Sequence, residues 1–448
     1  MRKALLHNGW AGILVAYKLA MEIIYLCYIY RFSQLYGWWG TFYRIDVTLA
    51  GYVSGWTVCV AIVFLFRTTL QKPLEEYRFS EFVLLVLLLL SVIPGMAMCS
   101  IGAFPWEYRF LFYCYWLLFF LLGRVLSGVK LRASVDRGRL SPRGAKGLLF
   151  TVGTVVAVSI VFIFFYYGGG RFFVAGLQSP EVYVQRLNFS QVALMFPLNY
   201  IKANAGVVCL FLLLFFLGNQ RYGWAGIVLF IWYMEFSCSP NKIELFSILI
   251  GVFIYAVRNY LTINRMLGLA VGFVLAGMGL FDFGKSLYVM SFLCRTLFET
   301  NWLSYCYYDF FQNHAPMVYR FFEVSVLDRG KIPFLIGAQY LDNPATHANN
   351  GLLGDAFLMA GVYGVILGPI LWQIYLYIVD KASNRLEWWV KLAVSIFWVS
   401  TMQNGSFATS MLSHGGVAII ILAYLCGSAR PDTEVLHNRL ERPRLLKW

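Results

Sequence analysis

The chain has 448 residues, of which 60% are apolar, 18% aromatic and only 13% charged, and its mean hydropathy is +0.66. Ordinary soluble domains carry about 25% charged residues, so the composition excludes one, and the aromatic content excludes intrinsic disorder. The formal net charge is +14. In so apolar a chain, an excess of Lys and Arg is typical of cytoplasmic loops between membrane spans rather than of nucleic-acid binding.

Apolar runs of 17 to 28 residues alternate with short polar stretches along the whole chain. A helix needs about 20 such residues to cross a bilayer, and continuous rather than alternating apolarity indicates helices rather than a barrel. We therefore predict an all-α polytopic bundle, a single transmembrane domain over 1–448 with about twelve spans. The predicted spans are 10–30, 45–66, 80–99, 106–126, 147–168, 191–217, 223–239, 242–258, 266–284, 352–379, 387–403 and 407–426.

The distribution of basic residues predicts the orientation of these spans. The first run follows Arg2 and Lys3 but is long and shows no cleavage site, so we interpret it as an uncleaved span. With a cytoplasmic N-terminus, and with cations at span ends counted in the adjoining segment, inside segments carry 23 Lys and Arg and outside segments carry 10. The tail 427–448 is one of the basic inside segments. This asymmetry predicts that both termini are cytoplasmic.

Two outer segments are long enough to carry function. Residues 169–190 include Ser179-Pro180-Glu181, a pattern that predicts a helix start. Residues 285–351 form a 67-residue loop rich in aromatic residues, and loops of this length are usually functional. We expect short helices at the membrane surface, with rings that either anchor the loop in the interface or stack against a sugar.

Cations gather on the predicted outer side, beside the N-termini of the sixth, eighth and tenth spans. Helix N-termini attract phosphate, and Arg and Lys strengthen such a site. The candidate anion ligands are Arg171, Arg186, Lys202, Lys242 and Arg295. Two alternatives stay open, namely that the arginines contact lipid headgroups and that Lys242 pairs with Glu235 or Glu244. Lys202 is expected about 16 Å into the sixth span, where it needs a counter-charge or water.

Two titratable residues near the tenth span are candidate catalytic groups. His347 and Asp355 could each serve as a general base, while Asp355 could instead orient the start of that span. The sequence has no Cys-x-x-Cys pair and no cation-binding carboxylate motif such as Asp-x-Asp, so we predict neither a metal nor another cofactor. A disulfide between Cys294 and Cys306 is left open.

The arrangement of these features resembles the Wzy-type O-antigen polymerases. The resemblance rests on twelve spans, Arg186 in a middle outer loop, the turn at Lys242, Arg295 in a long late loop, and the segment from Asn343 through His347-Ala348-Asn349 to Gly361 and Gly364. It covers about 160–425, whereas the first four spans agree only in hydropathy. The family often has Asn-Ala-Asn where this chain has His347-Ala348-Asn349, which puts the role of His347 in question.

The resemblance implies a metal-independent glycosyltransferase of the GT-C type in the inner membrane of a Gram-negative bacterium, with its active site in the periplasm. Its substrates would be undecaprenyl-pyrophosphate-linked oligosaccharides, and its surroundings the lipid bilayer. His347, Asp355 and Arg295 would act in catalysis, and Arg171, Arg186, Lys202, Lys242 and Asn349 would bind the pyrophosphate or glycan. A polysaccharide chain-length regulator is a partner that the resemblance leaves open, and nucleic acid is not expected.

Other classes remain as alternatives. A ligase of the same fold would transfer the finished glycan to lipid A core. A catalytic histidine in the long late loop would favour this class, and His314 and His347 both lie there. A lipid-linked oligosaccharide flippase would have similar length and charge but should show related halves. An ordinary transporter is expected to show discontinuous spans, which the sequence does not indicate.

Overall fold

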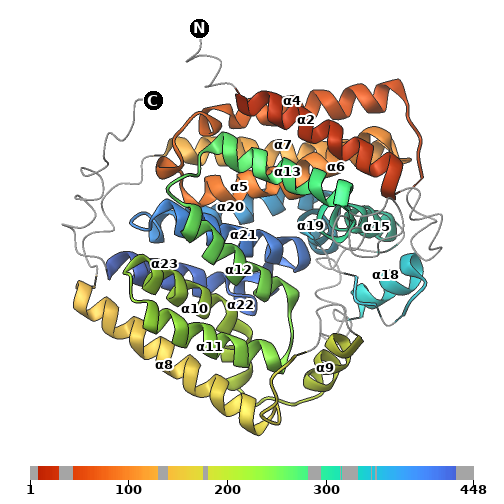
Figure 1. Cartoon of the computed structure of the whole chain (residues 1–448). Helices are drawn as coiled ribbons and strands as arrows, with labels where there is room; N and C mark the ends of the chain where they lie inside the picture. The colour runs from red at the N-terminus through yellow and green to blue at the C-terminus, as the bar shows by residue number, and fades with distance from the viewer. Residues whose placement is uncertain are drawn as a thin grey trace. The chain divides into compact units, whose positions relative to one another are not determined.

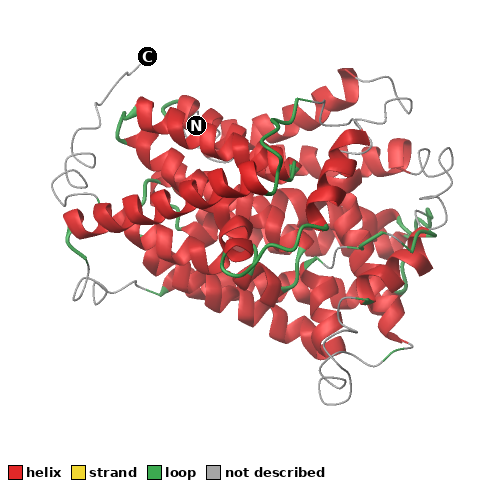
Figure 2. Cartoon of the chain, turned by 90° about the horizontal axis from the view of Figure 1, so that it is seen from below, coloured by secondary structure: helices red, strands yellow, loops and turns green. Residues whose placement is uncertain are grey.

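The structure is a computed structural model that describes residues 9–29, 44–129, 140–174, 180–280, 294–312, 314, 331–344, 346–348 and 351–429. Throughout these ranges the regular structure is helical, and the one β-type pairing there is an isolated antiparallel bridge between Ile45 and Gly102 (Figure 2). The predicted all-α polytopic class is thus confirmed. Asn349, the tail from 430 onward and much of the loop 285–351 lie outside the described residues.

Eight helical segments are long and apolar enough to cross a membrane, by length and composition, and each coincides with a predicted span. They are Gly9–Cys27, Leu49–Leu70, Phe79–Ile101, Trp106–Gly128, Pro142–Tyr166, Leu198–Gly218, Leu352–Ala382 and Phe407–Ser428. The other four predicted spans also form helices, of 16 to 18 residues, namely α11 (Tyr222–Cys238), α12 (Lys242–Val257), α13 (Ile263–Leu280) and α21 (Trp388–Asn404). At 1.5 Å per residue these are about 24 to 27 Å long.

The described helices divide between two units, which we treat separately. Unit 1 comprises 1–129, 260–375 and 399–407, and unit 2 comprises 130–259, 376–398 and 408–448. Besides α13, unit 1 contains α2 (Gly9–Ile24), η1 (Tyr25–Ile29), α4 (Leu49–Leu70), η2 (Leu74–Glu76), α5 (Phe79–Leu87), η3 (Leu88–Val92), α6 (Ile93–Ile101), α7 (Trp106–Gly128), η5 (Cys294–Glu299), α15 (Thr300–Gln312), α18 (Ile332–Leu341), α19 (Leu352–Ala360) and η6 (Gly361–Tyr363). Helix α20 (Gly364–Ala382) passes from unit 1 to unit 2 after Tyr375, and α21 passes back after Trp398.

The continuous segment α5–η3–α6 is the core of unit 1, because 94% of the span Phe79–Ile101 is buried (Figure 1). Its middle turn, η3, is a wider π-type turn. In such a turn the Leu89 carbonyl would accept from the N–H of residue 94, but Pro94 has none. The Tyr17 hydroxyl on α2 donates to this carbonyl at 2.9 Å. The proline therefore explains a contact that ties α2 to the core.

Two of the long apolar segments are interrupted helices, contrary to the expectation of uninterrupted spans. Helix α19 ends at Gly361, whose φ of 57° no side-chain-bearing residue adopts easily, and α20 starts after the short turn η6. Helix α22 (Phe407–Leu412) is separated from α23 (Gly416–Ser428) by Gly415, with φ of 95°. Neither break was predicted, because both flanking halves are apolar and a window average hides the glycines between them.

In the described part of the long loop, α15 packs in the interior of unit 1 rather than on its surface. Trp302, Tyr307 and Tyr308 on this helix are buried. Their rings pack inside unit 1 against α7 and α19, with Tyr108 and Phe357 each in contact with Tyr308. Aromatic content alone does not distinguish a buried helix from an interfacial one.

Unit 2 is organised around α10 (Leu198–Gly218). Helices α8 (Pro142–Tyr166), α11, α12 and α23 all contact it, and α10 runs beside α11 and α8 in Figure 1. The short helix α9 (Pro180–Ser190) begins at the predicted position and packs against α11. Because α8, α10, α11 and α12 follow one another as antiparallel neighbours, the end of α8 and the start of α10 meet the end of α11 and the start of α12.

Candidate functional site

Lys202 lies in a buried charged cluster at this end of unit 2. Its Nζ is 3.1 Å from Glu235 Oε1, and the Glu235 side chain is completely buried. Glu244 of α12 also acts electrostatically on Lys202. Helix α10 begins at Leu198, whereas the predicted span begins at 191. Lys202 is therefore four residues from the helix start, about 6 Å along the helix axis instead of the predicted depth of about 16 Å. The predicted need for a counter-charge is met by Glu235.

Lys242 starts α12 beside the same cluster. Asn241 caps this helix, because its Oδ1 accepts from the Ile243 N–H at 3.2 Å while its amide donates to Glu244 Oε1 at 3.3 Å. Lys242 itself is partly buried. The cap fixes where the helix begins. Glu244 therefore lies in the first turn of α12, where it faces Gly206 of α10.

Arg186 lies on α9, and this helix contacts the cluster through Gln185 and Phe189. The Gln185 amide donates to the Ser237 and Cys238 carbonyls at 3.3 and 3.4 Å, and the Phe189 ring lies 5.7 Å from Lys202 Nζ. Arg186 is exposed and, within the described residues, takes part in no ion pair. The arginine is therefore held near Lys202 with its guanidinium open to solvent or to a ligand.

Arg171 belongs to the same end of unit 2. The segment containing it is fixed by the Tyr233 hydroxyl, which donates to the Phe173 carbonyl at 2.8 Å, and by stacking of Phe172 on Tyr233. Arg171 is exposed and, like Arg186, has no ion-pair partner in the described part of the chain. The structure thus places Arg171, Arg186, Lys202 and Lys242 on segments at the same end of unit 2.

The remaining predicted residues lie in unit 1. Arg295 is exposed, and its Nε donates to Glu299 Oε2 at 3.3 Å, one turn later. Burial raises the pKa of Glu299, and the neighbouring Arg295 opposes this shift. Part of the positive charge of Arg295 is therefore already balanced by a carboxylate of its own segment.

The two candidate bases differ sharply in exposure. His347 is exposed, and its ring meets the Phe334 ring edge-on at 5.2 Å. Asp355 is only 4% exposed and accepts from the Phe407 N–H at 2.8 Å. This hydrogen bond favours the alternative in which Asp355 orients the start of α19 and ties it to α22.

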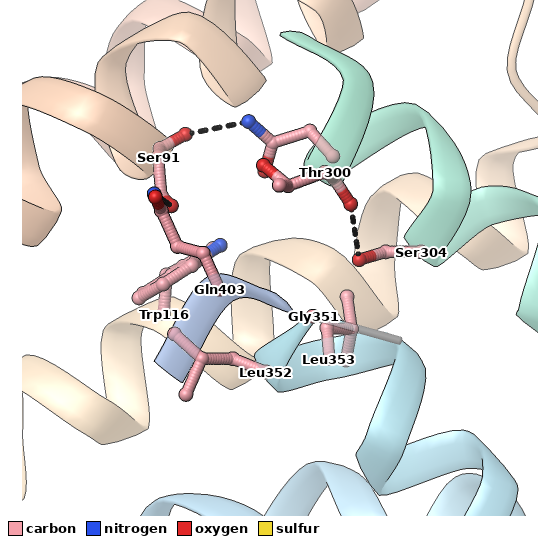
Figure 3. Close-up of a pocket in the computed structure, with 9 residues that line it drawn as sticks. Ser91, Trp116, Thr300, Ser304, Gly351, Leu352, Leu353 and Gln403 are labelled. Atoms are coloured by element: carbon pink, nitrogen blue, oxygen red, sulfur yellow. Dashed lines mark hydrogen bonds between the residues drawn. The ribbon is translucent and has the colours of Figure 1, made fainter. Parts of the chain in front are cut away.

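Sequence reasoning missed a polar cluster in the interior of unit 1. It surrounds a cavity of about 10 Å³, roughly the volume of one water molecule, between α15, η3, α7, α19 and the end of α21 (Figure 3). Asn301 Nδ2 donates to the Ser91 carbonyl at 3.0 Å, and Gln403 Nε2 donates to the Ser91 hydroxyl at 2.5 Å. The cavity is lined by Ser91, Trp116, Thr300, Asn301, Ser304, Gly351, Leu352, Leu353 and Gln403. Its members are scattered polar residues in apolar runs, with no shared motif.

A second hollow, an open groove of about 440 Å³, lies between α15 and α18. The His314 ring stacks on Phe310 with 4.0 Å between centroids and 5° between planes. The groove is otherwise lined by Phe311, Ile332, Leu335, Ala338 and Gln339. A hollow lined by aromatic and aliphatic side chains, with His314 and Gln339 as its polar members, is suited to a sugar ring.

Comparison with known proteins leaves the family open, since no protein-family model, curated protein or solved structure matches the chain. Within the described ranges, no three His, Cys, Asp or Glu side chains are grouped so that they could hold a metal ion. Cys306 is buried and free, and the side chain of Cys294 lies outside the described ones. Metal independence and the disulfide stay predictions.

Proposed function

We propose that the chain is a polysaccharide polymerase that joins oligosaccharide units carried on undecaprenyl pyrophosphate, working in the inner membrane of a Gram-negative bacterium. In this proposal the four helices of 16 to 18 residues also cross the bilayer, giving twelve crossings, a GT-C-type arrangement and cytoplasmic termini. The sequence resemblance to Wzy-type polymerases supports the assignment. The chain-length regulator remains a proposed partner.

The observation that carries the proposal is the group of cations at one end of unit 2. Arg171 and Arg186 are exposed and have no ion-pair partner in the described part of the chain, whereas Lys202 is balanced by Glu235. The N-termini of α10 and α12 lie at this end and add partial positive charge. A pyrophosphate, with several negative charges, matches this arrangement better than a neutral sugar does.

The chemistry requires a leaving group to be stabilised and a hydroxyl to be activated. A hydroxyl of the acceptor sugar attacks the anomeric carbon of the growing chain, the bond from that carbon to the pyrophosphate oxygen breaks, and the hydroxyl proton passes to a base. Arg171 and Arg186 would strengthen their contacts as charge develops on the departing oxygen. His347 is the proposed base because it is exposed, and Asp355 is assigned a positioning role.

The groove between α15 and α18 is the proposed glycan contact. Its Phe310 and His314 rings offer a stacked apolar face, and Gln339 offers hydrogen bonds to hydroxyls. These contacts would orient a sugar without charge, which fits a substrate whose charge is confined to its lipid carrier. Trp, Phe and His side chains in such grooves contribute to sugar binding through the surface area that they bury and the orientation that they impose, rather than through strong individual hydrogen bonds.

The experiment is a gel of surface lipopolysaccharide from the native host, with the chain deleted and then restored as variants. We expect the deletion to leave core bearing a single repeat unit, because export and ligation continue without polymerisation. The double variant R171A/R186A should reproduce this pattern. R143A is the matched control, because Arg143 is equally exposed but lies in the first turn of α8, at the opposite end of that helix.

Two results would contradict this proposal, the first its polymerase assignment and the second its pyrophosphate site. Core without any repeat, together with polymer on the lipid carrier, would indicate the ligase instead. A wild-type ladder from R171A/R186A at normal protein abundance would remove the pyrophosphate role of the unit 2 cations.

A flippase is the second candidate, and the interrupted helices favour it. Helix α19 breaks before α20, and buried polar side chains such as Asn301 and Gln403 lie in the interior of unit 1. Broken helices with polar interiors are typical of transporters. A flippase deletion would give core without repeat units and would trap the single lipid-linked unit on the cytoplasmic face, which distinguishes it from both enzymes.

A further inference from the structure

Arg109 is a buried arginine whose charge has no visible counterpart. It lies in the first turn of α7 and is only 2% exposed. Its Nη2 donates to the Gly102 carbonyl at 2.7 Å, whereas Nε and Nη1 are buried without any hydrogen-bond partner. The Trp106 ring lies 5.0 Å from the guanidinium carbon. Three donor hydrogens of a permanent cation are therefore left without an acceptor.

The guanidinium lies directly on the first turn of α4. A Cβ placed on Gly51 would be 2.0 Å from Arg109 Nη1, so only a residue without a side chain allows this approach. Thr48 caps α4 by accepting from the Gly51 N–H at 3.1 Å, which leaves the N–H groups of Leu49 and Ala50 without a cap. Both of these residues are exposed.

This placement is electrostatically unfavourable for the protein alone. A helix N-terminus carries partial positive charge, and here a full positive charge is packed against it. Arg109 forms no ion pair within the described part of the chain. A buried charge without a partner destabilises the folded protein, so an external anion at this point would be strongly attracted.

We infer that Arg109 and the first turn of α4 form a binding site for a phosphate group. The site lies where the spans Leu49–Leu70 and Trp106–Gly128 both begin, which is the level of the lipid headgroups. Phosphate is the anion that is abundant at this level, and it combines well with guanidinium donors and helix N–H groups. The phosphate comes either from a lipid headgroup or from a soluble molecule, and the inference does not depend on the proposed polymerase activity.

The test measures the melting temperature of the full chain purified in dodecyl maltoside, which contains no phosphate. One arm adds sodium phosphate and compares it with sodium chloride at equal ionic strength. The other adds dioleoyl phosphatidylglycerol and compares it with dioleoylglycerol, which has the same acyl chains but no phosphate. Ligands that bind only the folded state raise its melting temperature, so the rise reports binding directly.

Two variants act on the site by different means. R109Q removes the charge, and G51A keeps the charge but displaces the guanidinium. R124Q is the control for the first, since Arg124 is exposed near the other end of α7 and its guanidinium contacts Thr68. G12A is the control for the second, because a Cβ on Gly12 meets nothing within 4 Å.

We expect wild type, R124Q and G12A to be stabilised by at least one phosphate source, with apparent affinity reduced about tenfold or more in R109Q and G51A. A response to phosphatidylglycerol alone identifies a lipid headgroup, and a response to sodium phosphate identifies a soluble group. Absence of a phosphate-specific rise in wild type would overturn the inference, as would equal rises in wild type and R109Q. A general loss of stability in R109Q does not imitate the result, because only the ligand-dependent difference is compared.

Discussion

The side-chain amide of Asn301 donates a hydrogen bond to the backbone carbonyl of Ser91, 3.0 Å away. Ser91 lies near the middle of the span Phe79–Ile101. Helix α15, which belongs to a predicted outer loop, therefore reaches about half the depth of that span and is held there by a polar contact. The buried position of α15 thus depends on a side chain that neither hydropathy nor motif searching singles out.

Replacing Asn301 with Ala should destabilise unit 1. The change removes hydrogen bonds to the Ser91 and Leu297 carbonyls at 3.0 and 3.2 Å in a residue that is 4% exposed. We expect a loss of about 2 kcal/mol in the free energy of unfolding, measured by SDS titration in mixed micelles. N188A, at an exposed position of α9, should change this free energy by less than about 0.5 kcal/mol. Equal stabilities of N301A and N188A would contradict the prediction.

Gly95 should not tolerate a side chain. A Cβ at this position would lie 2.4 Å from Phe112 Cζ and 2.9 Å from Asn301 Oδ1, and both neighbours are buried. We expect G95A to lower the unfolding free energy by about 1 to 3 kcal/mol through overpacking. G12A should instead raise it by about 0.5 to 1 kcal/mol, since Ala stabilises a helix where space is open. A stabilised G95A would show that α6 and α15 are less tightly packed than the structure indicates.

The sequence predicts the positions of the long helices well, because about 20 consecutive apolar residues have few alternatives to spanning a bilayer. It also predicts the start of α9 at Pro180, where capping chemistry is local. It does not predict the breaks at Gly361 and Gly415, because the adoption of a positive φ depends on tertiary contacts. Nor does it predict that α15 is buried in unit 1, because aromatic rings suit an interface and a core equally.

The candidate site was predictable only in part. Lys202 needed a counter-charge, and Glu235 supplies it, but the pairing follows from the antiparallel arrangement of α10 and α11 rather than from spacing along the chain. Arg109 was not singled out, because isolated cations within a long apolar span, here Arg109 and Arg124, form no pattern. Its importance comes from its contact with Gly51 and from the buried donor atoms Nε and Nη1, which have no hydrogen-bond partner in the described structure, and only three-dimensional geometry reveals both.

Neutralising the two glutamates near Lys202 should lower the free energy of unfolding by very different amounts. E235Q leaves the Lys202 ammonium without its partner at 3.1 Å, and we expect a loss of about 3 kcal/mol in unfolding free energy. E244Q should cost less than about 0.5 kcal/mol, because Gln still accepts from Asn241 and the cluster loses one of two carboxylates facing one ammonium. SDS titration of both variants gives the comparison, and the double variant K202M/E235Q should recover part of the loss. A larger loss in E244Q than in E235Q would show that Glu244 is the main partner of Lys202.

The pair Arg295 and Glu299 should make the stability of unit 1 depend on pH. Burial raises the pKa of Glu299 above its value of about 4.3 in an unfolded chain, so the folded state binds the proton more tightly. The stability from this group is fully present below the unfolded pKa and is lost as pH rises through the folded pKa. Wild type should therefore lose more unfolding free energy than E299Q between pH 4 and pH 8, as measured by SDS titration at each pH.

R295A sharpens this test, because Arg295 is the group that opposes the shift. Removing it should raise the pKa of Glu299 further, since desolvation is then no longer offset by the nearby cation. The loss of stability with rising pH should consequently become larger than in wild type and extend to higher pH, while R295A/E299Q should show the flat profile of E299Q. Identical profiles for wild type, E299Q and R295A would mean that Glu299 is solvated well enough to ionise at its ordinary pKa, and that η5 is not packed into unit 1 as the burial of Phe298 and Leu297 indicates.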